Sequence, residues 1–261
     1  MRDYSQINKK WWDSATPVHA SSKFYGLESF KKGKTSLQSI EIKELGNVKG
    51  KTMLHLLCHF GMDSLSWARR GALVTGVDIS ESSIKLAKKL SREIETPAKF
   101  ICSDVNSLPE VLNQKFDIVF ASYGVLLWIS NLKKFAKLVK QYITDEGFFY
   151  IVDTHPFTNM LSFDFKFEYK YFDRGPYFDE SGTYADWNEN VKGGAYLWNH
   201  TMSDIVNAFV SQGLKIEYLH EFPFSTYDQF EGLMVKNKKG QYVLKDKKNQ
   251  IPLLFSLKAT R

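Results

Sequence analysis

Residues 54–80 read Leu54-His-Leu-Leu-Cys-His-Phe-Gly-Met-Asp-Ser-Leu-Ser-Trp-Ala-Arg-Arg-Gly-Ala-Leu-Val-Thr-Gly-Val-Asp-Ile-Ser80. The pattern predicts a buried strand over 52–57, a turn at Gly61, a helix that ends near Gly71, and a second strand that ends in Asp78. This order is typical of a nucleoside-binding α/β site, in which a glycine lets the ligand approach the backbone and an acid binds the ribose hydroxyls. We therefore expect Asp78 to bind a ribose.

Strands and helices continue to alternate outward from this stretch. Five further strands are predicted from short apolar runs, over 100–102, 116–120, 148–152, 214–220 and 253–258. Apolar spacing predicts amphipathic helices over 132–143 and 201–213, and the aromatic stretch 156–198 predicts an antiparallel insertion after the fifth strand. The predicted fold is therefore α/β: a Rossmann-like, seven-stranded, mostly parallel sheet with helices on both faces and a C-terminal antiparallel hairpin.

The composition indicates a soluble globular protein. The 261 residues are 43% hydrophobic and 25% charged, enough for a full core. The longest nearly apolar run, 118–129, is too short to cross a bilayer, and the N-terminus lacks the apolar stretch of a secretory signal. Two cysteines, Cys58 and Cys102, exclude a disulfide framework and a four-cysteine zinc site. We expect a cytoplasmic protein.

The net charge of +6 is concentrated in lysines over 31–34 and 236–248. Neither cluster alternates arginine with aromatics, so we interpret the C-terminal cluster as a solvated loop, and nucleic acid is disfavoured as a partner. The six histidines are scattered, and His55 and His59, although four apart, lie in a strand-to-turn setting. No metal site is therefore expected.

Three motifs resemble class I S-adenosylmethionine-dependent methyltransferases. Gly71–Ser80 resembles the second-strand motif of this family, Ser103-Asp104-Val105 the motif after the third strand, and Phe116–Phe120 the fourth strand. The resemblance is strong over 50–155 and looser near the C-terminus. It implies S-adenosylmethionine as the methyl donor and S-adenosylhomocysteine as the product. A nicotinamide enzyme is disfavoured, because there is no complete Gly-x-Gly-x-x-Gly motif.

The first motif departs from the family pattern. His55 stands at the position of the family's acid, which orders the amino group of the cofactor, and Leu57 and His59 replace the first two glycines. Cys58 and Gly61 match. A neutral imidazole accepts a hydrogen bond as the acid does, so His55 stays a candidate cofactor ligand. Some small-molecule methyltransferases share this variant motif, which favours variation of the site over its loss.

The resemblance implies cofactor contacts at the ends of four strands. They are Leu57, Cys58 and Gly61 along the methionine part, Asp78 at the ribose, Ile79 on the adenine face, Asp104 and Val105 at the adenine amino group, and Ser122 near the sulfonium. From residue type alone, Ile79 and Val105 are equally consistent with core packing, and Asp104 with the cap of a turn.

Three residues are candidates for a catalytic base. His155 directly follows the fifth strand, at the edge where ligands of such sheets bind. His200 precedes the 201–213 helix, and Tyr123 follows the fourth strand. Each could instead have a structural role: His155 at the end of a strand, His200 at the boundary of a helix, and Tyr123 in packing. Some methyl acceptors need a base and others do not, and the sequence leaves this open.

The resemblance also divides the chain. Residues 1–45 are expected to form a helical lid, 46–155 and 199–261 the methyltransferase domain, and 156–198 an insertion that shapes the substrate pocket. The expected acceptor contacts are aromatic, namely Trp11, Trp12, Tyr25, Tyr196 and Trp198. Packing against the core is an equally good reading of the paired tryptophans.

We therefore predict an enzyme, monomeric or homodimeric, that methylates a nitrogen or oxygen atom of a small organic acceptor. The basic surplus keeps an RNA methyltransferase as one alternative. The altered first motif keeps another, a catalytically silent methyltransferase fold that serves as an interaction protein.

Overall fold

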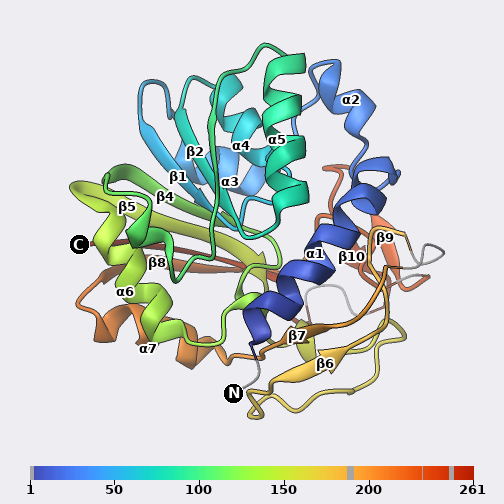
Figure 1. Cartoon of the computed structure of the whole chain (residues 1–261). Coiled ribbons are helices and arrows are strands. Elements are labelled where there is room, and N and C mark those ends of the chain that lie inside the picture. Colours follow the sequence, from blue (N-terminus) through green and yellow to red (C-terminus); the bar gives the residue numbers. More distant parts are fainter. Residues whose placement is uncertain (1–2, 187–190, 231, 247–249) are drawn as a thin grey trace.

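A computed structural model describes residues 3–186, 191–230, 232–246 and 250–261, and its centre is a seven-stranded sheet (Figure 1). The strand order is β3-β2-β1-β4-β5-β11-β8. The strands are β1 (Thr52–Leu56), β2 (Leu73–Asp78), β3 (Lys99–Cys102), β4 (Phe116–Ser122), β5 (Ile143–Thr154), β8 (Lys215–Phe222) and β11 (Leu254–Thr260). The first five pair in parallel, and β11 pairs antiparallel with β5 and β8. The predicted fold, with its terminal antiparallel pair, is confirmed.

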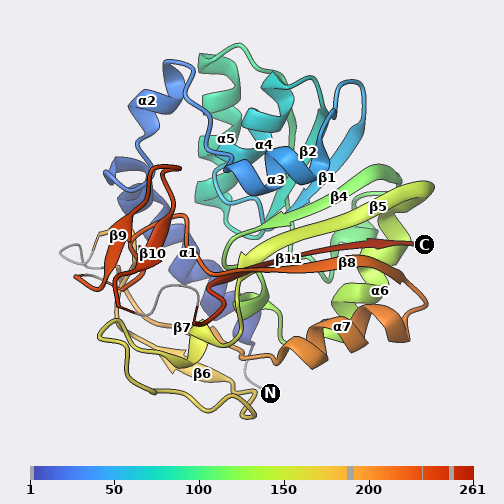
Figure 2. The same cartoon turned by 180° about the vertical axis from the view of Figure 1, so that it is seen from behind.

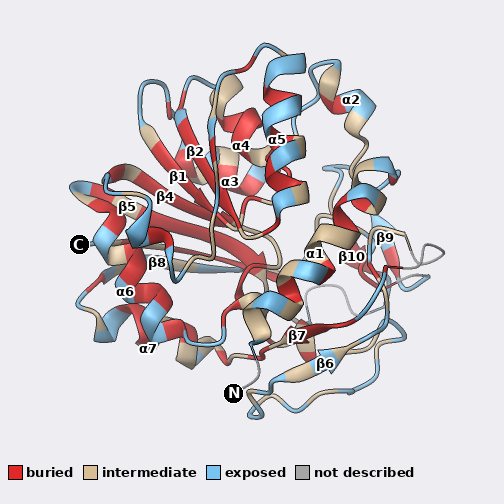
Figure 3. Cartoon of the chain, viewed as in Figure 1, coloured by how far each residue is buried: buried red, intermediate tan, exposed pale blue. Residues whose placement is uncertain are grey.

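Helices cover both faces of the sheet because side chains alternate along each strand. Leu54 and Leu56 of β1 belong to a core that includes α6 (Leu132–Tyr142) and α7 (Met202–Ser211). Met53, which precedes Leu54 in β1, packs in a second core with Trp67 of α4 (Met62–Arg69), on the other face of the sheet. The core of that face continues to α5 (Glu81–Glu93). Figure 3 shows the resulting continuous band of buried strands.

The N-terminal segment forms three helices, α1 (Tyr4–Ser21), α2 (Leu27–Lys31) and α3 (Ser39–Leu45). Helix α3 packs on the same face of the sheet as α4, through Ile40 and Leu45. Helix α1 instead runs beside the first turn of α5 and beside β7 (Ala195–Leu197), as Figure 1 shows. It therefore lies next to the carboxyl ends of the parallel strands.

Two small hairpins flank the carboxyl edge of the sheet (Figure 2). The predicted insertion contains β6 (Tyr177–Asp179), which pairs antiparallel with β7, and a second pair joins β9 (Met234–Lys236) to β10 (Tyr242–Leu244). The lysine-rich segment was predicted to be a loop because of its charges, but part of it forms this second hairpin. Met234 and Leu244 of this hairpin are buried and pack with Phe230 and Leu253, and this small core stabilises the hairpin.

Three short 3₁₀ turns complete the described elements, η1 (Leu108–Glu110), η2 (Leu126–Trp128) and η3 (Thr158–Met160). Strand β5 begins five residues earlier than the predicted strand 148–152. Among the described residues, none of the helices has the length and apolar character needed to span a membrane.

Candidate cofactor site

The turn after β1 keeps the backbone geometry of a glycine-rich loop with fewer glycines. Leu57 and His59, which replace glycines of the family motif, have φ values of 52° and 50°, and Gly61 has 79°. A left-handed conformation costs a non-glycine residue about 1–2 kcal/mol. At Gly61 a Cβ atom would lie 2.7 Å from the Phe100 ring and 3.1 Å from Ala87. The turn therefore keeps a strained conformation that brings its backbone to the end of β2.

Asp78, the predicted ribose ligand, ends β2 and faces this turn. One carboxylate oxygen accepts a hydrogen bond from the amide of His59 at 2.8 Å, and the other accepts one from the amide of Ser80 at 2.9 Å. Burial raises the pKa of Asp78 to about 6, although both amides lower it. Each carboxylate oxygen has a further lone pair, so the group fits the two hydroxyls of a ribose. Partly buried Ile79 follows directly.

The residues predicted at the adenine lie next in space, after β3. Asp104 accepts hydrogen bonds from the amide of Asn106 at 2.7 Å and from the hydroxyl of Ser5 on α1. Val105 is partly buried and packs against the core. Cys58, in the turn, is buried beside Gly76. The structure thus gathers Cys58, Asp78 and Asp104 at one edge, at and beyond the carboxyl ends of β1, β2 and β3.

His55 lies at the same strand end but points into the core. Its Nδ1 atom is 2.8 Å from the hydroxyl of Ser64, and its ring stands edge-on to Phe120 at 4.8 Å. Burial lowers the pKa of His55 to about 3, so the ring is neutral. The first motif consequently contributes no charged side chain to the site.

Two carboxylates that the sequence analysis did not single out lie beside β4. Asp63, in the first turn of α4, accepts hydrogen bonds from Ser122 at 2.9 Å and from Ser36 at 2.6 Å. Glu41 of α3 is fully buried and accepts a hydrogen bond from the Tyr123 hydroxyl at 2.9 Å. Burial and then the charge of Asp63 raise the pKa of Glu41 to about 8. An acid early in a helix reads from sequence as a dipole partner, which is why Asp63 was missed.

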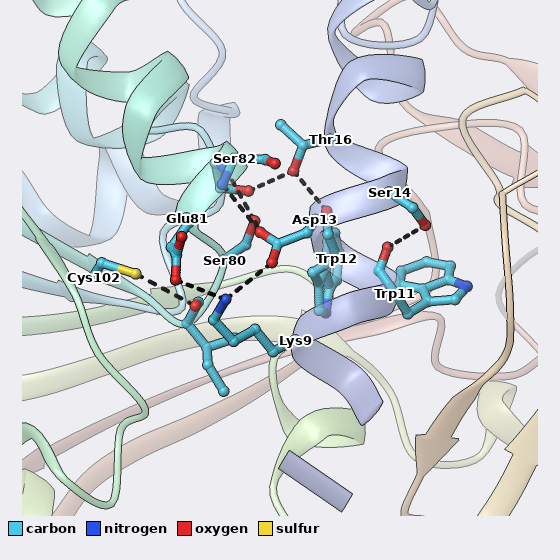
Figure 4. A network of polar contacts seen from close by, with 12 residues as sticks. Lys9, Trp11, Trp12, Asp13, Ser14, Thr16, Ser80, Glu81, Ser82 and Cys102 are labelled. Carbon is cyan, nitrogen blue, oxygen red and sulfur yellow. Dashed lines mark hydrogen bonds and ion pairs between the residues drawn. The ribbon is translucent and has the colours of Figure 1, made fainter. Parts of the chain in front are cut away.

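Helix α1 is fastened to the start of α5 by a polar network (Figure 4). Asp13 accepts hydrogen bonds from the Ser80 hydroxyl at 2.7 Å and the Ser82 amide at 3.0 Å. Lys9 bridges Asp13 and Glu81 at 3.1 and 2.9 Å. Because Ser80 also bonds Asp78, the helix is tied to the predicted ribose position.

Two histidines connect the turn to the N-terminal helix and the insertion. Nε2 of His59 lies 2.9 Å from Nδ1 of His19, whose Nε2 lies 2.6 Å from the Thr183 hydroxyl. On its other side, His59 lies 2.9 Å from the hydroxyl of Ser83. Burial lowers the pKa of His19 to about 4, so this chain of contacts is uncharged at neutral pH. Residues 19 and 59 are too far apart in sequence for a spacing argument to join them.

The three candidate bases have different surroundings. Nε2 of His155 is 2.9 Å from Glu221, and its Nδ1 accepts a hydrogen bond from the Phe157 amide at 3.1 Å. Nε2 of His200 is 2.8 Å from the Ile129 carbonyl oxygen. Burial lowers the pKa of both histidines. Both imidazoles thus contact other groups of the protein, and the Tyr123 hydroxyl donates a hydrogen bond to the buried Glu41 carboxyl.

The predicted acceptor contacts form two groups. Trp12 and Tyr25 lie near the turn, with ring centroids 4.9 and 5.5 Å from that of His59, and Trp11 packs on Trp12 at 5.1 Å. Tyr196 and Trp198 are buried and pack instead against Tyr4, at the start of α1. Among the described residues, no three or more His, Cys, Asp or Glu side chains form a group that could hold a metal ion.

Known proteins match this chain in sequence and in fold. A family model described as a methyltransferase domain matches residues 54–151. A ubiquinone biosynthesis O-methyltransferase of Chromobacterium violaceum is 32% identical over 116 residues, which are 44% of this chain and 46% of that protein. The chain thus spans about half the length of the curated relatives it matches.

Solved structures extend the similarity over most of the chain. An S-adenosylmethionine-dependent methyltransferase of Listeria monocytogenes has a TM-score of 0.61 at 17% identity, covering 85% of this chain and 95% of the other. Magnesium protoporphyrin IX methyltransferase of Synechocystis, with S-adenosylmethionine bound, has a TM-score of 0.55 at 14% identity, covering 100% and 98%. These matches confirm the predicted fold.

Proposed function

We propose that residues 54–151, which match a methyltransferase-domain family model, bind S-adenosylmethionine, and that the protein methylates a small organic acceptor at a nitrogen or oxygen atom. The observation that carries the proposal is the position of Asp78, whose carboxylate faces the left-handed turn after β1. The relatives named ubiquinone biosynthesis O-methyltransferase support a small-molecule acceptor and favour an oxygen atom.

The bound cofactor would supply an activated methyl group on a sulfonium. The protein then has to align the acceptor atom with that methyl group and to exclude water. Asp78 would hold the ribose hydroxyls through its free lone pairs, and Asp104 would accept the adenine amino group. Ile79 and Val105 are partly buried beside them and would pack on the adenine. Ser122, at the end of β4, would lie nearest the reacting methyl group.

Tyr123 is the candidate base that the contacts support best. Its hydroxyl donates a hydrogen bond to Glu41, and the pKa of Glu41, raised to about 8, leaves only a minor ionised fraction at neutral pH that can take up a proton through Tyr123. His155 and His200 would instead shape the acceptor side by fixing the chain after β5 and before α7. We propose no metal, since alignment alone suffices for displacement at a sulfonium.

Helix α1 would act as a lid over the cofactor. Its Ser5 hydroxyl bonds Asp104, the predicted adenine ligand, and its Asp13 bonds Ser80 beside the predicted ribose ligand. Both contacts would open to admit a nucleoside and form again over it. The aromatic insertion around Tyr196 and Trp198 would close the acceptor side, because it packs on the same helix.

Calorimetry with S-adenosylmethionine and S-adenosylhomocysteine tests the cofactor site. We expect micromolar binding, weakened at least about tenfold in Asp78→Ala, since a hydrogen bond to a charged group is worth about 1.5–3 kcal/mol. Asp145→Ala is the control, because it removes an exposed carboxylate that pairs only with Arg261 among the described residues. A folded protein that binds neither ligand, or equal affinity in Asp78→Ala, would contradict the proposal.

A further inference from the structure

Five polar side chains form one continuous chain of hydrogen bonds that passes through the turn after β1. They come from four parts of the fold: Thr16 and His19 from α1, His59 from the turn, Ser83 from α5 and Thr183 from the insertion. The distances between successive donor and acceptor atoms lie between 2.6 and 2.9 Å. The chain thus joins the turn to the N-terminal helix, to α5 and to the insertion.

The donors and acceptors along this chain have one consistent assignment. The Thr16 hydroxyl lies 2.8 Å from the Trp12 carbonyl oxygen, one helical turn earlier, and must donate to it because a carbonyl oxygen only accepts (Figure 4). Thr16 therefore accepts from the Ser83 hydroxyl. Since that hydroxyl has a single hydrogen, Ser83 in turn accepts from Nδ1 of His59. A backbone carbonyl of helix α1 thus decides which nitrogen of His59 carries the hydrogen.

The same assignment fixes the tautomer of the second histidine. A neutral imidazole carries one N–H, so His59, which donates from Nδ1, accepts at Nε2 from Nδ1 of His19. His19 in turn accepts at Nε2 from the Thr183 hydroxyl. Both rings are neutral at pH 7, because burial lowers the pKa of His19 to about 4, and burial and then His19 lower the pKa of His59. The His59 ring is consequently held at both of its nitrogens.

The chain compensates a strained backbone at residue 59. The φ of 50° at His59 is unfavourable for a residue with a side chain, and in this conformation the His59 amide donates to Asp78 at 2.8 Å. Such strain persists only where surrounding contacts over-determine it. Two of those contacts are the hydrogen bonds to the His59 ring, and the bond from His19 exists only while α1 lies against the turn.

We propose that His19 is a positioning residue of the cofactor turn, acting through the His59 ring and so making the cofactor site depend on the docking of helix α1. Its effect passes from the His59 ring to the His59 amide, and from there to the carboxylate of Asp78. The inference rests on the proposed function, because Asp78 is the residue proposed to hold the ribose of the cofactor.

A double-mutant cycle tests this route. Glycine adopts a left-handed backbone without support, so His59→Gly should keep the turn in place independently of His19. Calorimetry with S-adenosylhomocysteine compares the effect of His19→Phe in the wild-type and His59→Gly backgrounds. We expect His19→Phe to weaken binding about tenfold in the wild-type background and less than about twofold in the His59→Gly background.

Two amide variants distinguish the partners of His19. His19→Asn places a donor near the position of Nδ1 and should recover most of the affinity in the wild-type background. His19→Gln reaches toward Thr183 and not toward His59, so it should behave as His19→Phe does, and it replaces that variant if His19→Phe does not fold. The control is His220→Phe, which should leave the affinity unchanged. His220 contacts Glu44 at 2.8 Å from β8, four strands away from β1.

Two NMR readouts need no ligand. The side-chain nitrogen spectra should show the Nδ1–H tautomer at both His19 and His59 in the wild type. Hydrogen exchange of the His59 amide should be at least about tenfold faster in His19→Phe, because the bond to Asp78 opens more often.

Several results would overturn the inference. No loss of affinity in His19→Phe, or equal losses in both backgrounds, would show that His19 does not act through His59. An Nε2–H tautomer at either histidine would contradict the direction of the chain. If the wild type binds no S-adenosylhomocysteine, the proposed function fails, and the tautomers and the exchange rate of the His59 amide then decide whether His19 positions the turn.

Discussion

The backbone amide of His59 donates a hydrogen bond of 2.8 Å to the carboxylate of Asp78, joining the turn after β1 to the end of β2. The amide points at the carboxylate because His59 has a φ of 50°, a conformation that glycine adopts more readily. The substitution therefore keeps the backbone contact of the motif and adds a side chain. That imidazole contacts His19 and Ser83, so the added side chain ties the turn to the helices around it.

The strain at His59 predicts that glycine stabilises the protein more than alanine at this position, the reverse of the order in a helix. Both His59→Gly and His59→Ala delete the ring, but only glycine relieves the left-handed backbone, so His59→Gly should be the more stable by about 1 kcal/mol. Lys88, exposed in the middle of α5, is the control position. There Lys88→Ala should be more stable than Lys88→Gly by about 1 kcal/mol. Urea unfolding of the four variants measures both differences. Equal stability of the two His59 variants would contradict this prediction, because it would mean that the backbone at residue 59 leaves the left-handed conformation in His59→Ala at no cost.

Gly61 should tolerate alanine less well than Gly26 does. Both glycines are in the left-handed region, with φ of 79° and 56°, but a Cβ at Gly61 meets Phe100 at 2.7 Å, whereas at Gly26 the nearest atom is 3.8 Å away. Gly26→Ala therefore reports the backbone cost alone, and Gly61→Ala adds overpacking of about 1–3 kcal/mol. Chemical denaturation of both variants gives the difference. A smaller cost at Gly61 would mean that the Phe100 ring moves aside freely.

Glu41 should make the protein less stable as the pH rises. Its pKa is raised from 4.5 in the unfolded chain to about 8 in the folded protein, so the folded state binds the extra proton between these values. Stability is then lost progressively from about pH 4.5 to pH 8, by at most a few kcal/mol. In Glu41→Gln this loss should be absent. Melting temperatures from pH 5 to 9 test this, with Glu44→Gln on the same helix as the control.

Loss of the Asp13 contacts should speed the exchange of the cofactor. Asp13 fastens α1 to Ser80 and Ser82, whereas Asp3 caps the same helix at its exposed end through the Gln6 amide. In Asp13→Ala, S-adenosylhomocysteine should dissociate several-fold faster, because truncating a charged hydrogen-bond partner costs about 1–3 kcal/mol. Stopped-flow fluorescence of Trp12, whose ring lies 4.9 Å from that of His59, follows the release. An equal effect of Asp3→Ala would indicate fraying of the helix and no lid.

The sequence alone determined the order of the seven strands of the main sheet and the ends of β2 and β3, whereas β4 extends two residues beyond the predicted strand 116–120. Asp78, Asp104 and Ser122 were placed correctly at the carboxyl edge, because strand periodicity and turn residues are local signals, and parallel strands present their ends at the same edge. The antiparallel pairing within the insertion was also predicted. The hairpin of β9 and β10 was not, because the surrounding lysines led to the prediction of a loop.

Only the tertiary structure decided which side chains meet. Asp63 and Ser122, Glu41 and Tyr123, and His19 and His59 are separated by 59, 82 and 40 residues, and no local pattern relates them. The orientation of His55 likewise depends on Ser64 and Phe120, which enclose its ring. Their burial and mutual charges then set the pKa values, because desolvation and Coulomb energies depend on distances in space and not on separation along the chain.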